Sequence, residues 1–191
     1  MVKYDPAPGE ESSVALALAN TLRRGPTGEV DHLVHARNVE GWVAEHRLAT
    51  QPLRFSERDV GRLTELRAAV RELFTAAIEE SAPDSAVLAT VNGAAAGAPG
   101  AAQLRWHPPS HRSEWKSTVP HTVDAVLACI ASDAIDVLSG PRGTLLRQCA
   151  AHGCIRFFLR EHSRRQWCSN MCGDRVRAAR HYQRNRDQAD G

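Results

Sequence analysis

Four cysteines near the C-terminus constrain the fold of this chain more than any other feature. Cys149, Cys154, Cys168 and Cys172 fall in the pattern C-x4-C-x13-C-x3-C. Each close pair can supply two corners of a tetrahedron, and the spacer is long enough to fold back and bring the second pair to the first. The spacing predicts a Zn2+ ion held by all four thiolates, with an iron centre or a redox thiol cluster as the alternative.

The predicted coordination sphere is closed, because four thiolates leave no open position for water or substrate. His152 and His162 lie near enough in sequence to replace a thiolate, although four cysteines make this unnecessary. We find no Ser-His-Asp pattern, phosphate-binding loop or dinucleotide fingerprint, so we do not expect an enzyme. The fifth cysteine, Cys129, lies among apolar residues and is expected to be a small buried hydrophobe.

Paired free thiols are typical of a reducing compartment, where cysteines bind metals rather than form disulfides. The sequence has no apolar run of membrane-spanning length and no recognisable export signal. These features predict a cytoplasmic protein that does not associate with membranes.

The net charge of +2 hides a strong polarity along the chain. Residues 1–141 contain 13 basic and 18 acidic side chains, whereas residues 142–186 contain 11 arginines and only Glu161 and Asp174 as acids. A zinc centre with four thiolates would lower the positive charge of the second region by about two and leave it basic.

The arginines of the last predicted helix fall mainly on one side of it. At 100° per residue, Cys172, Val176, Ala179 and Gln183 share the face expected to point toward the metal, and an arginine-rich stripe lies opposite. Phosphate is the natural partner of such a surface, and a solvated charge run is the alternative. The predicted nucleic-acid contacts are Arg164, Arg165, Arg175, Arg177, Arg180, His181 and Arg184.

The region before the cysteines predicts a mostly helical domain over residues 10–140. Apolar periodicity and capping residues predict helices over 14–24, 31–46, 56–80, 84–96 and 122–138, and two strands over 103–107 and 114–119. The linker is predicted at 139–143.

The second predicted domain, over 143–186, is a treble-clef-like finger made of a knuckle, a β-hairpin and a helix. The hairpin is expected to pair residues 156–159 with residues 166–167, and the terminal helix is expected to begin at Cys168. A unit of about 40 residues has too small a core to fold without its metal.

The segment from Arg165 to Cys168 and the run Cys172-Gly173-Asp174-Arg175 resemble the CGNR zinc finger. The N-terminal region, with its ALALANTLRR segment, resembles the ABATE domain that precedes this finger. The resemblance implies a bacterial stress-associated transcription regulator that binds DNA through the finger. Asp174 stands where the name-giving motif has Asn, and its charge could favour the start of the helix or repel a phosphate.

We therefore expect a zinc-containing regulator of duplex DNA, whose helical domain forms a homodimer or senses a small-molecule effector. The alternative is a protein-interaction finger, with arginines that meet an acidic partner, attached to a ligand-sensing helical domain.

Overall fold

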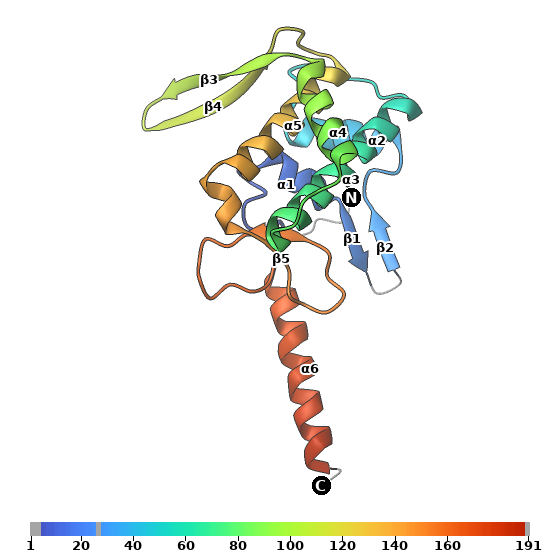
Figure 1. The fold of residues 1–191 in the computed structure, drawn as a ribbon, viewed down its shortest axis with the longest axis vertical. Coiled ribbons are helices and arrows are strands. Elements are labelled where there is room, and N and C mark those ends of the chain that lie inside the picture. The colour runs from blue at the N-terminus through green and yellow to red at the C-terminus, as the bar shows by residue number, and fades with distance from the viewer. Residues whose placement is uncertain (1–4, 26–27, 190–191) are drawn as a thin grey trace.

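The computed structural model describes residues 5–25 and 28–189. Helices α1 to α5 form a body, from which a long hairpin extends sideways at one end and helix α6 projects at the other (Figure 1). The elements in chain order are α1 Val14–Ala19, β1 Leu22–Gly25, β2 Gly28–Asp31, α2 Ala36–Glu45, α3 Glu57–Glu79, α4 Ser85–Gly97, β3 Gly100–His107, β4 Ser110–Ser117, α5 Val123–Ser139, η1 Pro141–Leu145, β5 Leu146–Gln148, β6 Phe157–Leu159 and α6 Asn170–Ala189. Helices make up about half of the chain, which confirms the predicted class of a mostly α protein with small sheets.

Helix α3 is the centre of the body and packs against α1, α4 and α5. Its start is fixed by a capping box, in which the Ser56 hydroxyl accepts from Asp59 N while the Asp59 carboxylate accepts from Ser56 N. Leu63, Val70 and Phe74 are fully buried along one side of the helix. The predicted start and apolar face of this helix are confirmed.

Two predicted helices are shorter than expected because a small sheet replaces part of each. The helix predicted over 14–24 ends at Ala19, and Leu22–Gly25 forms strand β1. The helix predicted over 31–46 begins at Ala36, because Asp31 ends the partner strand β2 and residues 32–35 form an irregular connection. Pairing satisfies backbone groups of both segments, which outweighs the helical preference of Leu and Arg.

The β2 strand is held to α3 by a bidentate ion pair. Arg67, which is buried, donates to both carboxylate oxygens of Asp31 at 2.7 and 2.5 Å. Burial alone would raise the pKa of Asp31, but the hydrogen bonds from Arg67 and from Leu33 N bring this pKa below its usual value.

The predicted hairpin around Pro108 and Pro109 is present but longer than expected. Strands β3 and β4 pair antiparallel from Gly100 opposite Ser117 to His107 opposite Ser110. They form a separate two-stranded sheet, so neither outer edge is hydrogen-bonded to another described strand.

One apolar core extends from the helical body into the C-terminal region. Leu146, Phe157 and Leu159 are buried in the same cluster as Leu16, Leu63 and Ile130. The predicted division into two domains, residues 10–140 and 143–186, stays a prediction. Apolar side chains from both sides of this boundary pack together in the one core. No helix within the described ranges is both long enough and apolar enough to cross a membrane.

Candidate metal centre and basic helix

The four cysteines are positioned by two turns and the start of a helix. Cys149 follows strand β5, and Cys154 follows a bend at Gly153, whose φ of 73° lies in the region that favours glycine. Cys168 precedes α6, and Cys172 lies in its first turn. Ser169 caps that turn by accepting a hydrogen bond from Cys172 N.

The sulfur atoms have the spacing of a tetrahedral metal site. Cys168 Sγ lies 3.7 Å from both Cys154 Sγ and Cys172 Sγ, and all four sulfurs lie within 4.8 Å of one another. A tetrahedral ion with Zn–S bonds of about 2.3 Å requires S···S distances of about 3.8 Å. A disulfide requires about 2.05 Å, so these thiols form a cluster and not a pair of crosslinks.

Polar groups around the sulfurs favour negative charge on them. Cys168 N donates to Cys149 Sγ at 3.3 Å, and an Nη atom of Arg175 lies 3.6 Å from Cys172 Sγ. Hydrogen bonds from the Cys154 and Cys168 side chains lower the pKa of Cys149, while hydrogen bonds with Cys149 and Cys154 raise the pKa of Cys168. A divalent cation would stabilise all four thiolates together, because it offsets their mutual repulsion.

Apolar residues, both small and aromatic, surround the cysteines. Ala7, Ala151 and Phe158 are buried with three of the cysteines, and Trp167 and Val176 pack against this group. Ala7 lies 142 residues before Cys149, so the apolar surroundings of the metal centre come from two distant parts of the sequence.

The finger's hairpin differs from the one predicted. Strand β6 pairs with β5, which precedes the first cysteine, and Leu146 lies opposite Leu159. Residues 166–167 form no strand, although Gln166 O accepts a hydrogen bond from Ala150 N. The predicted pairing of 156–159 with 166–167 is therefore wrong, as is the helix start at Cys168, because α6 begins at Asn170.

Buried polar side chains join the finger to the helical body, and sequence reasoning missed them. Asn20 Nδ2 donates to Phe157 O, and Asn20 Oδ1 accepts from Phe157 N, both at 2.8 Å. Arg156 donates to Glu10 at 2.9 Å, with side-chain exposures of 9% and 4%. Asn20 also donates to Glu10 Oε1 at 2.6 Å. No signal in the sequence indicates that these residues meet, because the partners are 137 and 146 residues apart.

Helix α6 leaves the rest of the molecule soon after the metal centre (Figure 1). Val176 is its last residue with substantial burial, and residues 177–186 are exposed on every side. The prediction that Ala179 and Gln183 face the metal is wrong, because the body does not extend that far along the helix.

The predicted nucleic-acid residues lie on two parts of the finger. Arg164 is exposed and Arg165 is half-buried in the loop before Cys168, and the others lie on α6. Arg177 donates to Asp174 at 2.5 Å, and its guanidinium lies 5.8 Å from the centre of the Trp167 ring. Asp174 is beyond the first turn, so it does not favour the start of the helix as predicted.

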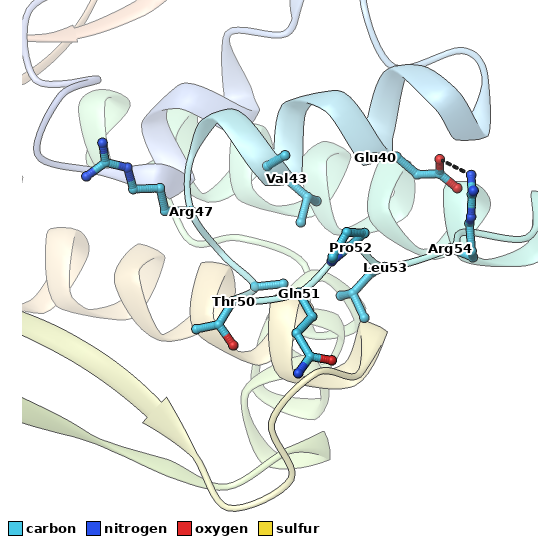
Figure 2. A pocket seen from close by; sticks show the side chains of 10 residues that line it. Glu40, Val43, Arg47, Thr50, Gln51, Pro52, Leu53 and Arg54 are labelled. Carbon is cyan, nitrogen blue, oxygen red and sulfur yellow. Dashed lines mark hydrogen bonds and ion pairs between the residues drawn. The ribbon is translucent and has the colours of Figure 1, made fainter.

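Two cavities lie beside the segment that follows α2, and both are lined by Arg47, Ala49 and Thr50. The first has a volume of about 380 Å³, and Figure 2 shows its Glu40–Arg54 ion pair near Pro52 and Leu53. The Arg47 side chain extends away from the other labelled residues (Figure 2).

The second cavity, of about 430 Å³, lies between this segment, β4 and α5. Its lining includes His46, Trp115, His121 and the half-buried Cys129. Burial, together with the negative charge of Asp133, raises the pKa of Cys129 to about 11, so this thiol stays protonated at neutral pH.

A mostly helical body that carries a four-cysteine finger defines a zinc-finger protein with an accompanying helical domain. Residues 12–141 match ABATE, described as "Putative stress-induced transcription regulator", and residues 146–185 match the CGNR zinc finger. The chain belongs to the ABATE family, and both resemblances seen in the sequence are confirmed. A comparison with curated proteins gave no match. The two family descriptions indicate a zinc-binding regulator.

Proposed function

We propose that the protein is a DNA-binding transcription regulator whose finger is folded around one structural Zn2+ ion. Cys149, Cys154, Cys168 and Cys172 would hold the ion, and the S···S distances of 3.7 Å support a tetrahedral site. The ion would supply structural crosslinking and no catalysis, since four thiolates complete its coordination.

The observation that carries the DNA proposal is the exposure of a basic helix on all sides. Between Asn170 and Arg186, α6 contains five arginines, and Asp174 is its only acid. A helix that is polar all round gains little from packing against its own chain, so its arginines stay accessible to a partner. At 1.5 Å per residue, its 20 residues extend about 30 Å, and a helix of this diameter fits the major groove of DNA.

Arg180 and Arg184 are the most direct candidates for phosphate contacts. Both are exposed and lie one helical turn apart, and no described carboxylate forms an ion pair with either. Arg177 forms an ion pair with Asp174, so it contacts a phosphate only when this pair opens on DNA binding. These contacts would position the helix, and they do not by themselves identify a DNA sequence.

The experiment is a fluorescence-anisotropy titration of zinc-loaded protein with duplex DNA over a series of salt concentrations. For the combined change Arg177→Ala, Arg180→Ala and Arg184→Ala, we expect the slope of log K against log salt to fall by about 0.9 for each phosphate that the variant no longer neutralises. We expect affinity at low salt to fall roughly 100-fold.

The matched control removes three exposed arginines from the helical body, by Arg37→Ala, Arg54→Ala and Arg58→Ala. It changes the net charge by the same amount and should leave the salt slope nearly unchanged. Equal reductions of affinity in the two triple variants would indicate a general charge effect and contradict the assignment to α6.

A second function, sensing of a small molecule by the helical body, is favoured by the 430 Å³ cavity. The indole Nε1 of Trp115, a lining residue, is buried and has no hydrogen-bond partner among the described residues. A ligand with a hydrogen-bond acceptor could satisfy this group. A thermal-shift screen of small carboxylates tests this function, with the variant Cys129→Trp, in which the cavity is filled, as the comparison. Ligands that stabilise the wild type and this variant equally would contradict it.

A further inference from the structure

The β3–β4 hairpin, Gly100–Ser117, is an arm that extends from the body with no described element covering its outer half (Figure 1). Leu104 and Trp106 near its tip are 66% and 64% exposed. A buried Trp removes 150–250 Å² from water, so leaving one exposed forgoes a large stabilisation. Exposed aromatic residues gathered on one surface are typical of protein–protein interfaces.

The arm is amphipathic across its two faces. The strand register places Ala102 opposite Trp115, Leu104 opposite Ser113, and Trp106 opposite His111 on one face. The Trp106 and His111 rings stack with their centres 3.6 Å apart, which gives this face a flat aromatic tip. The opposite face contains Gln103, Glu114, Arg105 and Lys116.

The root of the arm is closely packed, so its direction is fixed. Gly100 lies against the Trp115 ring, where a Cβ atom would come within 2.7 Å of a ring carbon. Thr118 N donates to Pro99 O at 2.9 Å and closes the base of the hairpin. An arm with a rigid root loses little conformational entropy when it binds a partner.

Charge identifies the surface that the arm fits. The arm contains three basic side chains and one acidic side chain, so two arms facing each other would repel. The rest of residues 1–141 contains ten basic and seventeen acidic side chains, so an arm is attracted to the body of another copy.

Helix α5 belongs to that body, and within one chain β4 contacts it. It contains three aspartates and no basic residue, and two of these aspartates already pair with arginines, Asp124 with Arg62 and Asp133 with Arg142. Ile135 is 36% exposed on α5, and the adjacent Asp136 is exposed without an ion-pair partner among the described side chains. Ile135 is an apolar contact for the Leu104–Trp106 face, whereas the charge of Asp136 attracts the arm as a whole, because its basic side chains lie on the other face.

We propose that two copies of the chain form a dimer by arm exchange, in which the Leu104–Trp106 face of each arm packs against α5 of the other copy. The contact is reciprocal, so it closes on itself as a two-fold dimer. Because the arm extends sideways and α6 extends along the length of the molecule, a two-fold axis parallel to α6 would place both basic helices at the same end (Figure 1). Two linked helices would strengthen the DNA binding proposed above, although the dimer itself does not depend on DNA.

Sedimentation velocity of the zinc-loaded full chain, without DNA, tests the dimer. We expect a dimer at micromolar concentration that weakens as salt increases, since its charges attract. Leu104→Ser with Trp106→Ser should give a monomer with an unchanged melting temperature, because both side chains are exposed. The matched control on the opposite face, Gln103→Ser with His107→Ser, should remain a dimer. A wild-type monomer at about 100 μM, or a dimer of the Leu104 and Trp106 variant, would overturn the proposal.

A crosslink locates the partner surface. Replacing Trp106 with p-benzoylphenylalanine and mixing isotope-labelled with unlabelled copies should give intermolecular crosslinks to residues 123–139. Crosslinks from arm to arm would overturn the exchange while leaving a dimer. The Arg177, Arg180 and Arg184 triple variant should still dimerise, so failure of DNA binding and failure of dimerisation are separate results.

Discussion

Asn20 is the residue whose side chain most directly joins the finger to the helical body. Its amide group makes two hydrogen bonds to the backbone of Phe157, in the manner of a short stretch of sheet, and a third to Glu10. All three bonds are buried, so no water replaces a partner that is removed.

We predict that Asn20→Ala lowers the free energy of unfolding of the zinc-loaded protein by about 3 kcal/mol, because it leaves buried groups of Phe157 and Glu10 unsatisfied. Urea denaturation followed by circular dichroism measures this change. The control Asn92→Ala removes an exposed amide from α4 and should change the free energy by less than about 0.5 kcal/mol. A comparable, small effect of both substitutions would show that the Asn20 bonds do not stabilise the fold.

The residues that make this network could not be predicted from the sequence. Asn20 and Phe157 are 137 residues apart, and Glu10 and Arg156 are 146 residues apart. A single sequence gives local periodicity and spacing, and it gives no signal for such distant pairs. The cysteine cluster could be predicted because its four members are close in sequence and of one chemical type.

Among the elements, α3 and α5 were predicted well because each combines a capping residue with a long apolar stripe. Ser56 caps α3, and Thr122 caps α5 by accepting a hydrogen bond from Ala125 N. Strand β1 was missed because Leu22, Arg23 and Arg24 continue the helical pattern of the preceding residues. Only its pairing with β2 makes it a strand, and that pairing is a tertiary effect.

The cap of α3 gives a prediction about stability and pH. Hydrogen bonds from the Ser56 side chain and backbone lower the pKa of Asp59 from its ordinary value of 3.8. The stability contributed by this ionised carboxylate is therefore present above pH 3.8 and is lost as the pH falls through the lowered pKa.

We predict that Ser56→Ala lowers the free energy of unfolding by about 1 kcal/mol at pH 7, and that the difference from wild type shrinks below about pH 4. Denaturation curves at several pH values measure this. Ser85→Ala, which changes an exposed serine at the first position of α4, is the control. A difference that grows in acid would mean that Asp59 does not act through Ser56.

At the scale of the whole molecule, the finger and the helical body share one core. Phe157 meets Phe74 of α3 edge to face with ring centres 5.6 Å apart, and the Arg71 guanidinium lies 5.0 Å from the centre of the Phe157 ring. Arg71 also donates to Ala19 O and Ile155 O. Loss of order at the cysteines should therefore spread to α1 and α3.

We predict that removal of zinc by a chelator lowers the melting temperature by roughly 10–20 °C and preserves a single calorimetric transition. Zinc analysis should find one ion per chain for wild type and for Cys129→Ser, and less than one for Cys172→Ser. Two separate transitions, with the helical body melting as before, would contradict the shared core.

The contacts of Pro8 and Glu10 also bear on how the chain folds during synthesis. Pro8 O accepts from Leu159 N, and Glu10 pairs with Arg156, so these groups meet partners that are synthesised about 150 residues after them. At about 5–20 residues per second, these groups remain in water for roughly 7–30 s before their partners leave the ribosome. This docking step of folding therefore waits for the finger, since residues 8–10 cannot complete their contacts until residues 156–159 have been synthesised.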